Sequence, residues 1–232
     1  VNCFDATVLP KVTNLQAQSD SPDFIFTWDS MLETDIKITD PKNPSTIGSG
    51  KVKDVFLGYE VEVYVRNVLA LTRIVTENKF IFDYDTNTKN GISRNVTFKV
   101  SVVAKYGARS PVNTINAVNY QQQVLSGIEV FGGLSGITVK FDAPTANDHR
   151  GVLVHMSKTR DFTPLSNNIL ADLVATNTIH QPVIDNGVYF FKLGAYDCFG
   201  KDSIVYSAQF EASVQDVNAM LADISSDQLS ID

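Results

Sequence analysis

The chain carries the strand pattern Val96-x-Phe98-x-Val100-x-Val102-x-Ala104-x-Tyr106-Gly107, and 93 positions later it carries Tyr189-x-Phe191-x-Leu193-x-Ala195-x-Asp197-x-Phe199-Gly200. An earlier pattern, Gly58-Tyr59-x-Val61-x-Val63, returns at the same offset as Gly151-Val152-x-Val154-x-Met156. Period-two alternation places side chains on alternate faces of a strand, one buried and one exposed to water. Two matches at one offset therefore predict two copies of one antiparallel β-domain.

An earlier strand extends the repeat at a different offset. Phe24-x-Phe26-x-Trp28, with Trp28 expected to point inward, corresponds to Ile137-x-Val139-x-Phe141, 113 positions later. The twenty-residue difference from 93 falls in 31–55 of the first copy, because the second copy has only 142–150 there. Residues 39–50 are rich in turn formers and poor in apolar residues, so we expect a long surface loop. Such loops often carry binding sites, and an insertion that only spaces its neighbours explains the stretch equally well.

The remaining strands follow from shorter apolar runs. In the first copy we expect strands at Val12–Ala17, 69–76, 79–82, from Asn95 onward and at 112–120. In the second copy, Ile128-x-Val130 and 205–214 are expected to be the first and last strands. Segment 165–175 fits either an irregular edge strand or one helical turn.

Four segments are expected along the chain. Residues 1–9 resemble the tail of a preceding element, 10–121 form the first domain, 122–214 the second, and 215–232 a helical linker. The joint at 121–123 is short and polar, which predicts a near-fixed relation between the domains. Val214, Val217, Leu221 and Ile224 recur at helical spacing. We favour a helix that leads into a following segment over a self-contained trimer seam.

Composition excludes some partners. The 232 residues are 44% hydrophobic and carry a net charge of −7, without a cluster of Lys and Arg. Nucleic-acid binding requires such a cluster to neutralise phosphates, so we expect no nucleic-acid partner. The apolar runs are far shorter than the roughly 20 residues that cross a bilayer, so we expect no membrane span. Cys3 and Cys198 lie at opposite ends of the chain, and we expect two free thiols rather than a disulfide.

No catalytic, cofactor-binding or metal-binding residue is expected. His149, His155 and His180 lack metal-site spacing, and the sequence has no Gly-x-Ser-x-Gly elbow. Asp142 and Asp148 flank a short loop and form a possible carboxylate pair, but a solvated turn explains them better.

Two local motifs suggest sites and fail on inspection. Residues 83–91 resemble the opening of a calcium loop, yet Thr88 occupies the glycine position and Arg94 the position of the bidentate glutamate. A turn between strands, marked by Asn90-Gly91, is the better interpretation. Asn95-Val96-Thr97 is a formal glycan acceptor, but it lies within an expected strand and is assigned no role.

The pattern ending at Gly200 resembles the sixth-strand signature of fibronectin type III modules, Tyr-x-Val-x-Val-x-Ala-x-Asn-x-x-Gly. Inward Trp28 followed by Gly58-Tyr59 resembles the second and third strands of the same module. The resemblance implies an all-β chain, with two tandem fibronectin type III-like sandwiches and a short C-terminal helical segment. It also implies that Tyr189 forms a tyrosine corner. In the first copy, Val96 stands at the tyrosine position of the signature and Ala104 at the asparagine position. These departures put in doubt the corner hydrogen bond of the first copy, not its fold.

A narrower resemblance concerns the second copy. Residues 151–162 and 189–200, with the acidic helical tail, are similar to modules of bacteriophage tail-tip proteins, including host-specificity, hub and central-fibre proteins. This resemblance implies a non-enzymatic structural segment in the phage virion. There a homotrimer would link the tail hub to the receptor-binding tip, with neighbouring hub or fibre proteins and a bacterial surface receptor as partners.

Two other classes of protein share the sandwich. The alternative reading is an extracellular binding module, either a secreted adhesin or an accessory domain of a carbohydrate-active enzyme. A cytokine-receptor ectodomain fits less well, because paired cysteines in the first copy and a Trp-Ser-x-Trp-Ser motif in the second are missing.

Overall fold

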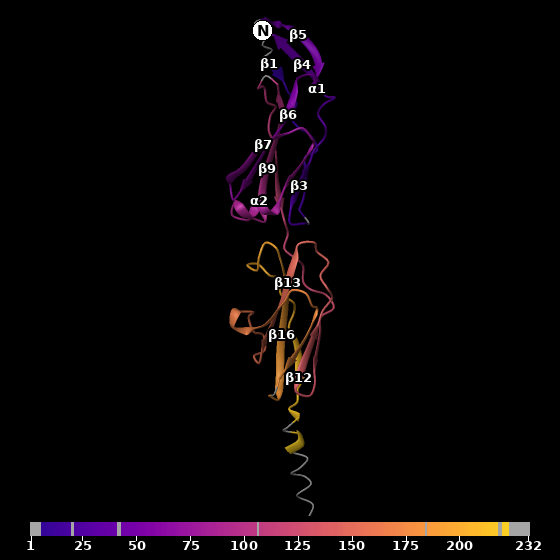
Figure 1. Ribbon diagram of the computed structural model, residues 1–232, viewed down its shortest axis with the longest axis vertical. Coiled ribbons are helices and arrows are strands. Elements are labelled where there is room, and N and C mark those ends of the chain that lie inside the picture. The colour runs from indigo at the N-terminus through magenta and orange to yellow at the C-terminus, as the bar shows by residue number, and fades with distance from the viewer. Residues whose placement is uncertain are drawn as a thin grey trace, which may run out of the picture. The chain divides into compact units, whose positions relative to one another are not determined.

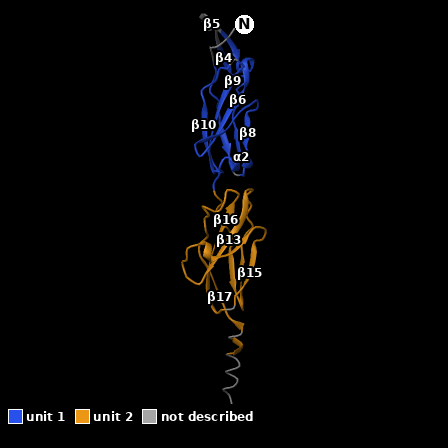
Figure 2. Ribbon diagram, turned by 60° about the vertical axis from the view of Figure 1, so that its left-hand side comes forward, with its two compact units in different colours: residues 1–120 blue, residues 121–232 orange. Residues whose placement is uncertain are grey.

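The computed structural model describes residues 6–19, 21–40, 43–105, 107–183, 185–217 and 220–222. The chain divides into two compact units, Val1–Tyr120 and Gln121–Asp232 (Figure 2). Figure 1 labels several strands of each unit and the two short helices of unit 1. Among the described residues, no helix has the length and apolar character needed to cross a membrane.

Unit 1 contains a seven-stranded antiparallel sandwich. One sheet has the order β2-β3-β8 and the other β10-β9-β6-β7. The strands are β2 (Gln16–Gln18), β3 (Phe24–Thr27), β6 (Phe56–Val65), β7 (Val68–Val75), β8 (Lys79–Phe82), β9 (Asn95–Ala104) and β10 (Asn113–Val118). The expected strand 79–82 and the expected start at Asn95 are confirmed. The observed ends of β7 and β10 lie within one or two residues of those expected for strands 69–76 and 112–120.

Unit 2 repeats this architecture. Its sheets have the orders β11-β12-β15 and β14-β13-β16-β17. The strands are β11 (Glu129–Gly132), β12 (Gly136–Lys140), β13 (His149–Ser157), β14 (Ile169–Leu173), β15 (Thr178–Pro182), β16 (Gly187–Asp197) and β17 (Phe210–Val214). When each unit's seven strands are counted in chain order, both units have sheets 1-2-5 and 4-3-6-7. This is the strand order of a fibronectin type III sandwich, so the expected fold class is confirmed, with helical residues following β17.

Residues 31–55 do not form the expected long loop. They contain strands β4 (Asp35–Asp40) and β5 (Asn43–Lys51), which pair as a hairpin, and the short helix α1 (Val52–Val55). Strand β1 (Ala6–Val8) pairs with β4, so the structure places part of the expected tail 1–9 in a third sheet of unit 1. The composition of 39–50 does not show this pairing, because the hairpin is held by main-chain hydrogen bonds, which Gly and Ser also form.

The expected turn within 83–91 is a helix, α2 (Tyr84–Lys89). The Asp83 carboxylate caps its first turn, accepting the Thr86 backbone N–H at 2.7 Å and the Thr86 hydroxyl at 2.9 Å. Asn87 is completely buried, and its side chain exchanges two hydrogen bonds with the backbone of Ser93, at 2.9 and 3.0 Å. A short helix with a capping aspartate therefore replaces a simple turn.

Segment 165–175 combines both expected alternatives. A single 3₁₀ turn, Ser166–Asn168, leads directly into edge strand β14. The last strand is shorter than the expected 205–214 and begins at Phe210; before it, Tyr206 forms only an isolated antiparallel bridge with Gly194 of β16. Gly194 permits the close approach of this segment, since a Cβ there would lie 2.2 Å from Ile204 and 2.9 Å from Tyr206.

The two cores use equivalent positions. In unit 1, the rings of Phe26 and Phe98 stack at 4.0 Å, and Trp28 packs edge-on against Tyr59 at 5.3 Å. Trp28 is 3% exposed, so its inward orientation is confirmed. In unit 2, Phe141 takes the corresponding place and is also 3% exposed, within the cluster formed by the inner faces of the two sheets.

The tyrosine corner is present in unit 2. The Tyr189 hydroxyl donates to the Asp185 carbonyl over 3.2 Å. Val96 occupies the counterpart position in unit 1, where it is buried and has no hydroxyl to make this bond. Gly107 and Gly200 follow the two long strands with φ of +90° and +114°, a conformation that glycine adopts without steric cost.

In unit 1, the first and last strands of the sandwich run in the same direction. Near their starts, the Asn113 amide donates to the Val12 carbonyl over 2.8 Å. Near their ends, the Ser19 hydroxyl donates to the Val118 carbonyl, and the Asn119 amide donates to the Ser19 carbonyl over 2.8 Å. The chain therefore enters this sandwich at one end and leaves it at the opposite end.

Unit 2 has the same arrangement. Leu134, just after β11, forms a parallel bridge with Gln215, just after β17. The Gln215 N–H donates to the Gly133 carbonyl over 3.2 Å, and the Ser135 N–H donates to the Gln215 carbonyl over 3.0 Å. Gly132 permits this close approach, because a Cβ there would lie 1.9 Å from the Ser213 carbonyl oxygen.

Candidate functional site

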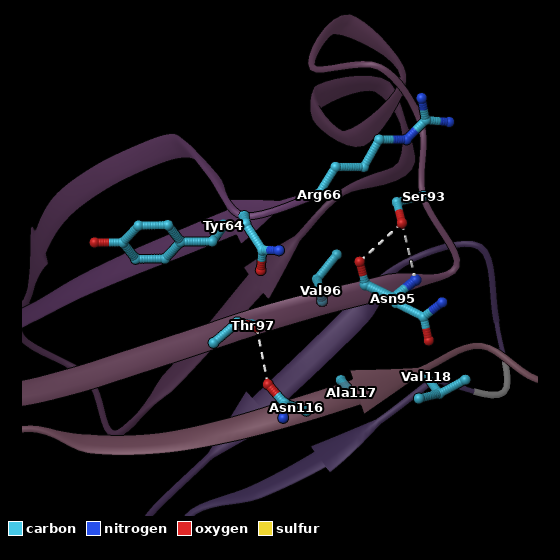
Figure 3. A pocket seen from close by; sticks show the side chains of 10 residues that line it. Tyr64, Arg66, Ser93, Asn95, Val96, Thr97, Asn116, Ala117 and Val118 are labelled. Carbon is cyan, nitrogen blue, oxygen red and sulfur yellow. Dashed lines mark hydrogen bonds between the residues drawn. The ribbon is translucent and has the colours of Figure 1, made fainter.

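A groove of about 410 Å³ lies on the outer face of the four-stranded sheet of unit 1. It is formed by the ends of three strands and by two connections, so that its residues come from three separate stretches of the chain, 64–67, 93–97 and 116–118 (Figure 3). The lining consists of Tyr64, Arg66, Asn67, Ser93, Asn95, Val96, Thr97, Asn116, Ala117 and Val118. Asparagine, serine and threonine predominate, and no carboxylate is present.

The two-residue turn between β6 and β7 forms one wall. Arg66 and Asn67 both have positive φ, 51° and 65°, as the central residues of a type I′ hairpin turn do. Asparagine tolerates this conformation better than most residues. An Arg66 guanidinium nitrogen donates to the Ile92 carbonyl over 3.1 Å and ties the turn to the segment before β9.

Strands β9 and β10 form the floor. Thr97 pairs directly with Asn116, and Asn95 with Val118. The Thr97 hydroxyl donates to the Asn116 side-chain oxygen over 2.8 Å, and the Ser93 hydroxyl donates to the Asn95 carbonyl over 2.8 Å (Figure 3). The Thr97–Asn116 bond joins the two strands at the edge of the groove, and the Ser93–Asn95 bond lies at the start of β9.

Three exposed side-chain amides around the groove keep hydrogen-bonding capacity. Within the described part of the chain, the amides of Asn67 and Asn95 make no hydrogen bond, and the Asn116 amide uses only its oxygen. Each free carboxamide offers two N–H donors and a carbonyl acceptor. The groove thus presents several unused donors and acceptors to solvent.

Tyr64 is oriented by its neighbours at the far end of the groove. Its hydroxyl donates to Glu62 over 2.8 Å, and the Lys99 ammonium lies 4.2 Å from the centre of its ring. Because Glu62 and Lys99 carry opposite charges, they leave this end of the sheet face close to neutral. Arg66 is the charged residue in the lining itself.

The three histidines lie apart in unit 2 and take hydrogen-bonding roles. His149 contacts the Gln122 side-chain oxygen at 2.9 Å, and burial lowers its pKa below the ordinary value. His155 is buried between Asn168 at 2.6 Å and the Tyr206 hydroxyl at 3.2 Å. His180 contacts Thr138 at 3.1 Å. Among the described residues, no group of three or more His, Cys, Asp or Glu is placed to hold a metal ion.

The structure separates the two aspartates flanking the loop 142–148. Asp142 is exposed and accepts a hydrogen bond from the Ser126 hydroxyl over 2.8 Å, as in a solvated turn. The same expectation for Asp148 is wrong, since it is 4% exposed. Its carbonyl accepts the Cys198 N–H over 2.9 Å, and the Gln122 amide lies 3.4 Å from its carboxylate. This backbone tie to the end of β16 draws the turn inward.

The other singled-out residues have structural placements. Asp83 is engaged in capping α2, which also holds the pKa of its carboxyl below the ordinary value, so it does not face a loop that could enclose calcium. Asn95 lies at the first position of β9 and lines the groove. Cys198 is a half-buried thiol after β16, and Cys3 lies outside the described residues.

Sequence reasoning missed the groove. Its amide-bearing residues are separated by 20 or more positions, and each one looks like an ordinary surface or turn residue on its own. The available signal was the Arg66-Asn67 turn, followed by asparagines at the outward positions of two strands that pair with each other.

Comparisons with known proteins find similar solved structures but no family. No protein-family model and no curated protein matches this chain. Among solved structures it is similar to the FN1–FN3 domains of chicken CNTN1, at 13% identity over 90% of this chain and 69% of that one, with a TM-score of 0.38. It is also similar to a two-domain fibronectin type III segment of chicken tenascin, at 12% identity over 86% and 98%, with a TM-score of 0.39. The strand order of each unit carries the fold assignment.

Proposed function

We propose that the chain is a non-enzymatic structural segment of a bacteriophage tail tip or central fibre, which links the tail hub to the receptor-binding tip as a homotrimer. Tandem sandwiches of this kind commonly serve structure or adhesion. The proposal goes further, because it assigns the chain to a virion and gives it hub or fibre proteins as neighbours.

One observation carries the spacer role: in each unit, the chain enters at one end of the sandwich and leaves at the other. The contacts Asn113–Val12 and Asn119–Ser19 establish this in unit 1, and the Leu134–Gln215 bridge establishes it in unit 2. A module with opposite termini adds its own length to a chain of modules. A module with adjacent termini would add little.

The hydrogen bonds between first and last strands also suit a load-bearing segment. In unit 1, Asn119 is 1% exposed and donates to both the Ser19 and Ser21 carbonyls, at 2.8 and 3.0 Å. These bonds connect residues about 100 positions apart in sequence. A pull on the ends of the unit must break them before the strands separate.

The residues after β17 support self-association. Helical residues begin at Val217 and continue at 220–222, where the side chains of Met220 and Leu221 are 41% and 57% exposed. Apolar side chains at helical spacing are stabilised when they pack against equivalent helices of other copies. A trimer would provide that packing.

The oligomeric state tests the assembly. Light scattering on the chain, with any segments that flank it in its parent protein, should give three times the mass of that single polypeptide. Leu221→Glu should reduce the mass to that of one chain. Asn147→Glu adds the same charge at an exposed turn of unit 2 and should leave the trimer intact. A strictly monomeric parent protein would contradict the trimer.

Location tests the virion assignment separately. Antibodies against the chain should label one end of tailed particles in electron micrographs of a lysate from a host that encodes it. Recovery of the protein only as a free secreted species would reject the phage assignment and favour the extracellular binding module.

A further inference from the structure

We propose that the groove of unit 1 is a carbohydrate-binding site, in which Asn95 and Asn116 bind hydroxyl groups on opposite sides of one sugar ring. The inference concerns the outer face of a single sandwich and does not depend on a place in a phage tail. Its basis is the side-chain amides of Asn67, Asn95 and Asn116, which lie around the groove and keep unused hydrogen-bonding capacity within the described part of the chain.

The strand register sets the distance between the two asparagines. Asn95 pairs with Val118 and Asn116 pairs with Thr97, so Asn95 and Asn116 are diagonal neighbours on the same outward face. Diagonal neighbours in an antiparallel pair lie about 7 to 8 Å apart. This separation is comparable to the span of one sugar ring with its hydroxyl groups, so two carboxamides on these strands can hold opposite sides of one ring.

The chemistry of the amides matches neighbouring hydroxyls. A carboxamide donates from nitrogen and accepts at oxygen in one plane, and two adjacent ring hydroxyls also present a donor and an acceptor side by side. Asn95 has both functions free, and Asn116 has both N–H donors free while its oxygen is held by Thr97. The Thr97 bond also fixes the orientation of the Asn116 amide, which lowers the entropy lost on binding.

The rest of the lining fits a polyhydroxylated ligand. Val118 is half-buried at the groove and offers apolar surface to the C–H groups of a ring, and the β6–β7 turn contributes Arg66 and Asn67 to the lining. The lining contains no carboxylate that would bind a cation. The groove, of about 410 Å³, is open to solvent along the sheet. Binding to one sugar unit within a longer glycan requires such an open groove.

Nuclear magnetic resonance on the ¹⁵N-labelled chain tests the site. The probes are the methyl glycosides of glucose, galactose, rhamnose and N-acetylglucosamine at millimolar concentration, with tetrahydropyran-2-methanol as a ring that lacks adjacent hydroxyls. At least one glycoside should shift the side-chain NH₂ signals of Asn95 and Asn116. The tetrahydropyran should shift neither signal.

Matched variants make the result specific. Asn95→Ala combined with Asn116→Ala should reduce the affinity at least tenfold, as read from the backbone signals of the β6–β7 turn. Asn147→Ala removes an exposed asparagine of unit 2 and should leave binding unchanged. Backbone signals away from the groove must stay in place in the double variant, which separates lost binding from lost folding.

Three outcomes would overturn the inference. No shift with any of the four glycosides, an equal shift with the tetrahydropyran, or unchanged binding by the double variant would each reject a sugar site at this groove. None of them bears on the trimer or on its location, which the light-scattering and labelling experiments decide.

Discussion

The Tyr59 hydroxyl accepts a hydrogen bond from the Met31 backbone N–H over 2.9 Å, across 28 positions of sequence. Both residues are buried, at 1% and 4% exposure. Tyr59 also packs edge-on against Trp28. Tyr59, which Val152 replaces in the second copy, thus joins the core of unit 1 to the start of the segment that leads into the hairpin.

Tyr59→Phe removes this acceptor and keeps the ring. The Met31 N–H then remains buried without a partner, which should destabilise unit 1 by about 1 to 3 kcal/mol. Urea unfolding of the variant measures this loss as a lower midpoint at an unchanged slope. Tyr189→Phe in unit 2 is the comparison, because it leaves a carbonyl unpaired rather than an N–H. A Tyr59→Phe midpoint equal to that of the wild type would contradict the bond.

Trp28 tests the core of unit 1 in two ways. Trp28→Ala should cost about 3 to 5 kcal/mol, as other large-to-small core substitutions do. Within the described residues, however, the buried indole N–H has no acceptor. Trp28→Phe removes that unsatisfied donor along with some volume, so it should stay within about 1.5 kcal/mol of the wild type. An Ala variant that loses less than about 1 kcal/mol would show that Trp28 is not part of the core.

The sequence predicted the parts of the fold that depend on burial. Trp28 and Phe98 alternate with less buried neighbours, and this period-two pattern exists because one face of each strand is buried. The Tyr189 corner was implied by the resemblance of its strand to the fibronectin type III signature, and its hydroxyl finds a partner only four residues away. These features depend on side chains, so they can be predicted from the sequence.

The sequence did not predict the features that depend on the main chain. The β4–β5 hairpin pairs residues such as Ile36 and Gly50 through backbone groups, which every residue type carries. Asp148 is buried because its carbonyl binds the Cys198 N–H, fifty positions away. The groove forms because Asn95 and Asn116 become neighbours when β9 pairs with β10. Composition alone contains none of these three relationships.

Glu60 and Arg109 should make the stability of unit 1 depend on pH. Two guanidinium nitrogens of Arg109 donate to the Glu60 carboxylate at 2.7 and 2.9 Å, and these bonds hold the pKa of Glu60 below its ordinary value. Because the pKa of Glu60 is lower in the folded protein than in the unfolded chain, where it is near 4.5, the Glu60–Arg109 pair stabilises unit 1 fully above that unfolded value. This stabilisation is lost as the pH falls through the folded-state pKa of Glu60.

Melting temperatures from about pH 7 to pH 3 measure this dependence. Arg109→Gln should melt below the wild type at neutral pH, and the difference should shrink as the pH falls below the unfolded pKa of Glu60. Arg73→Gln removes an exposed arginine of β7 and should show no such convergence. A difference between Arg109→Gln and wild type that stayed constant over the whole range would assign the effect to packing of the arginine stem.

Deleting 39–50 and closing the gap with a short turn separates the hairpin from the sandwich. Neither sheet of the sandwich contains a residue from this segment, and loop-closure entropy depends only weakly on loop length. The variant should therefore keep a cooperative unfolding transition and the wild-type near-ultraviolet signal of Trp28. The retained Ile36, which is 4% exposed, should account for most of any loss. Collapse of the Trp28 signal would instead show that β4 and β5 are required to complete the core of unit 1.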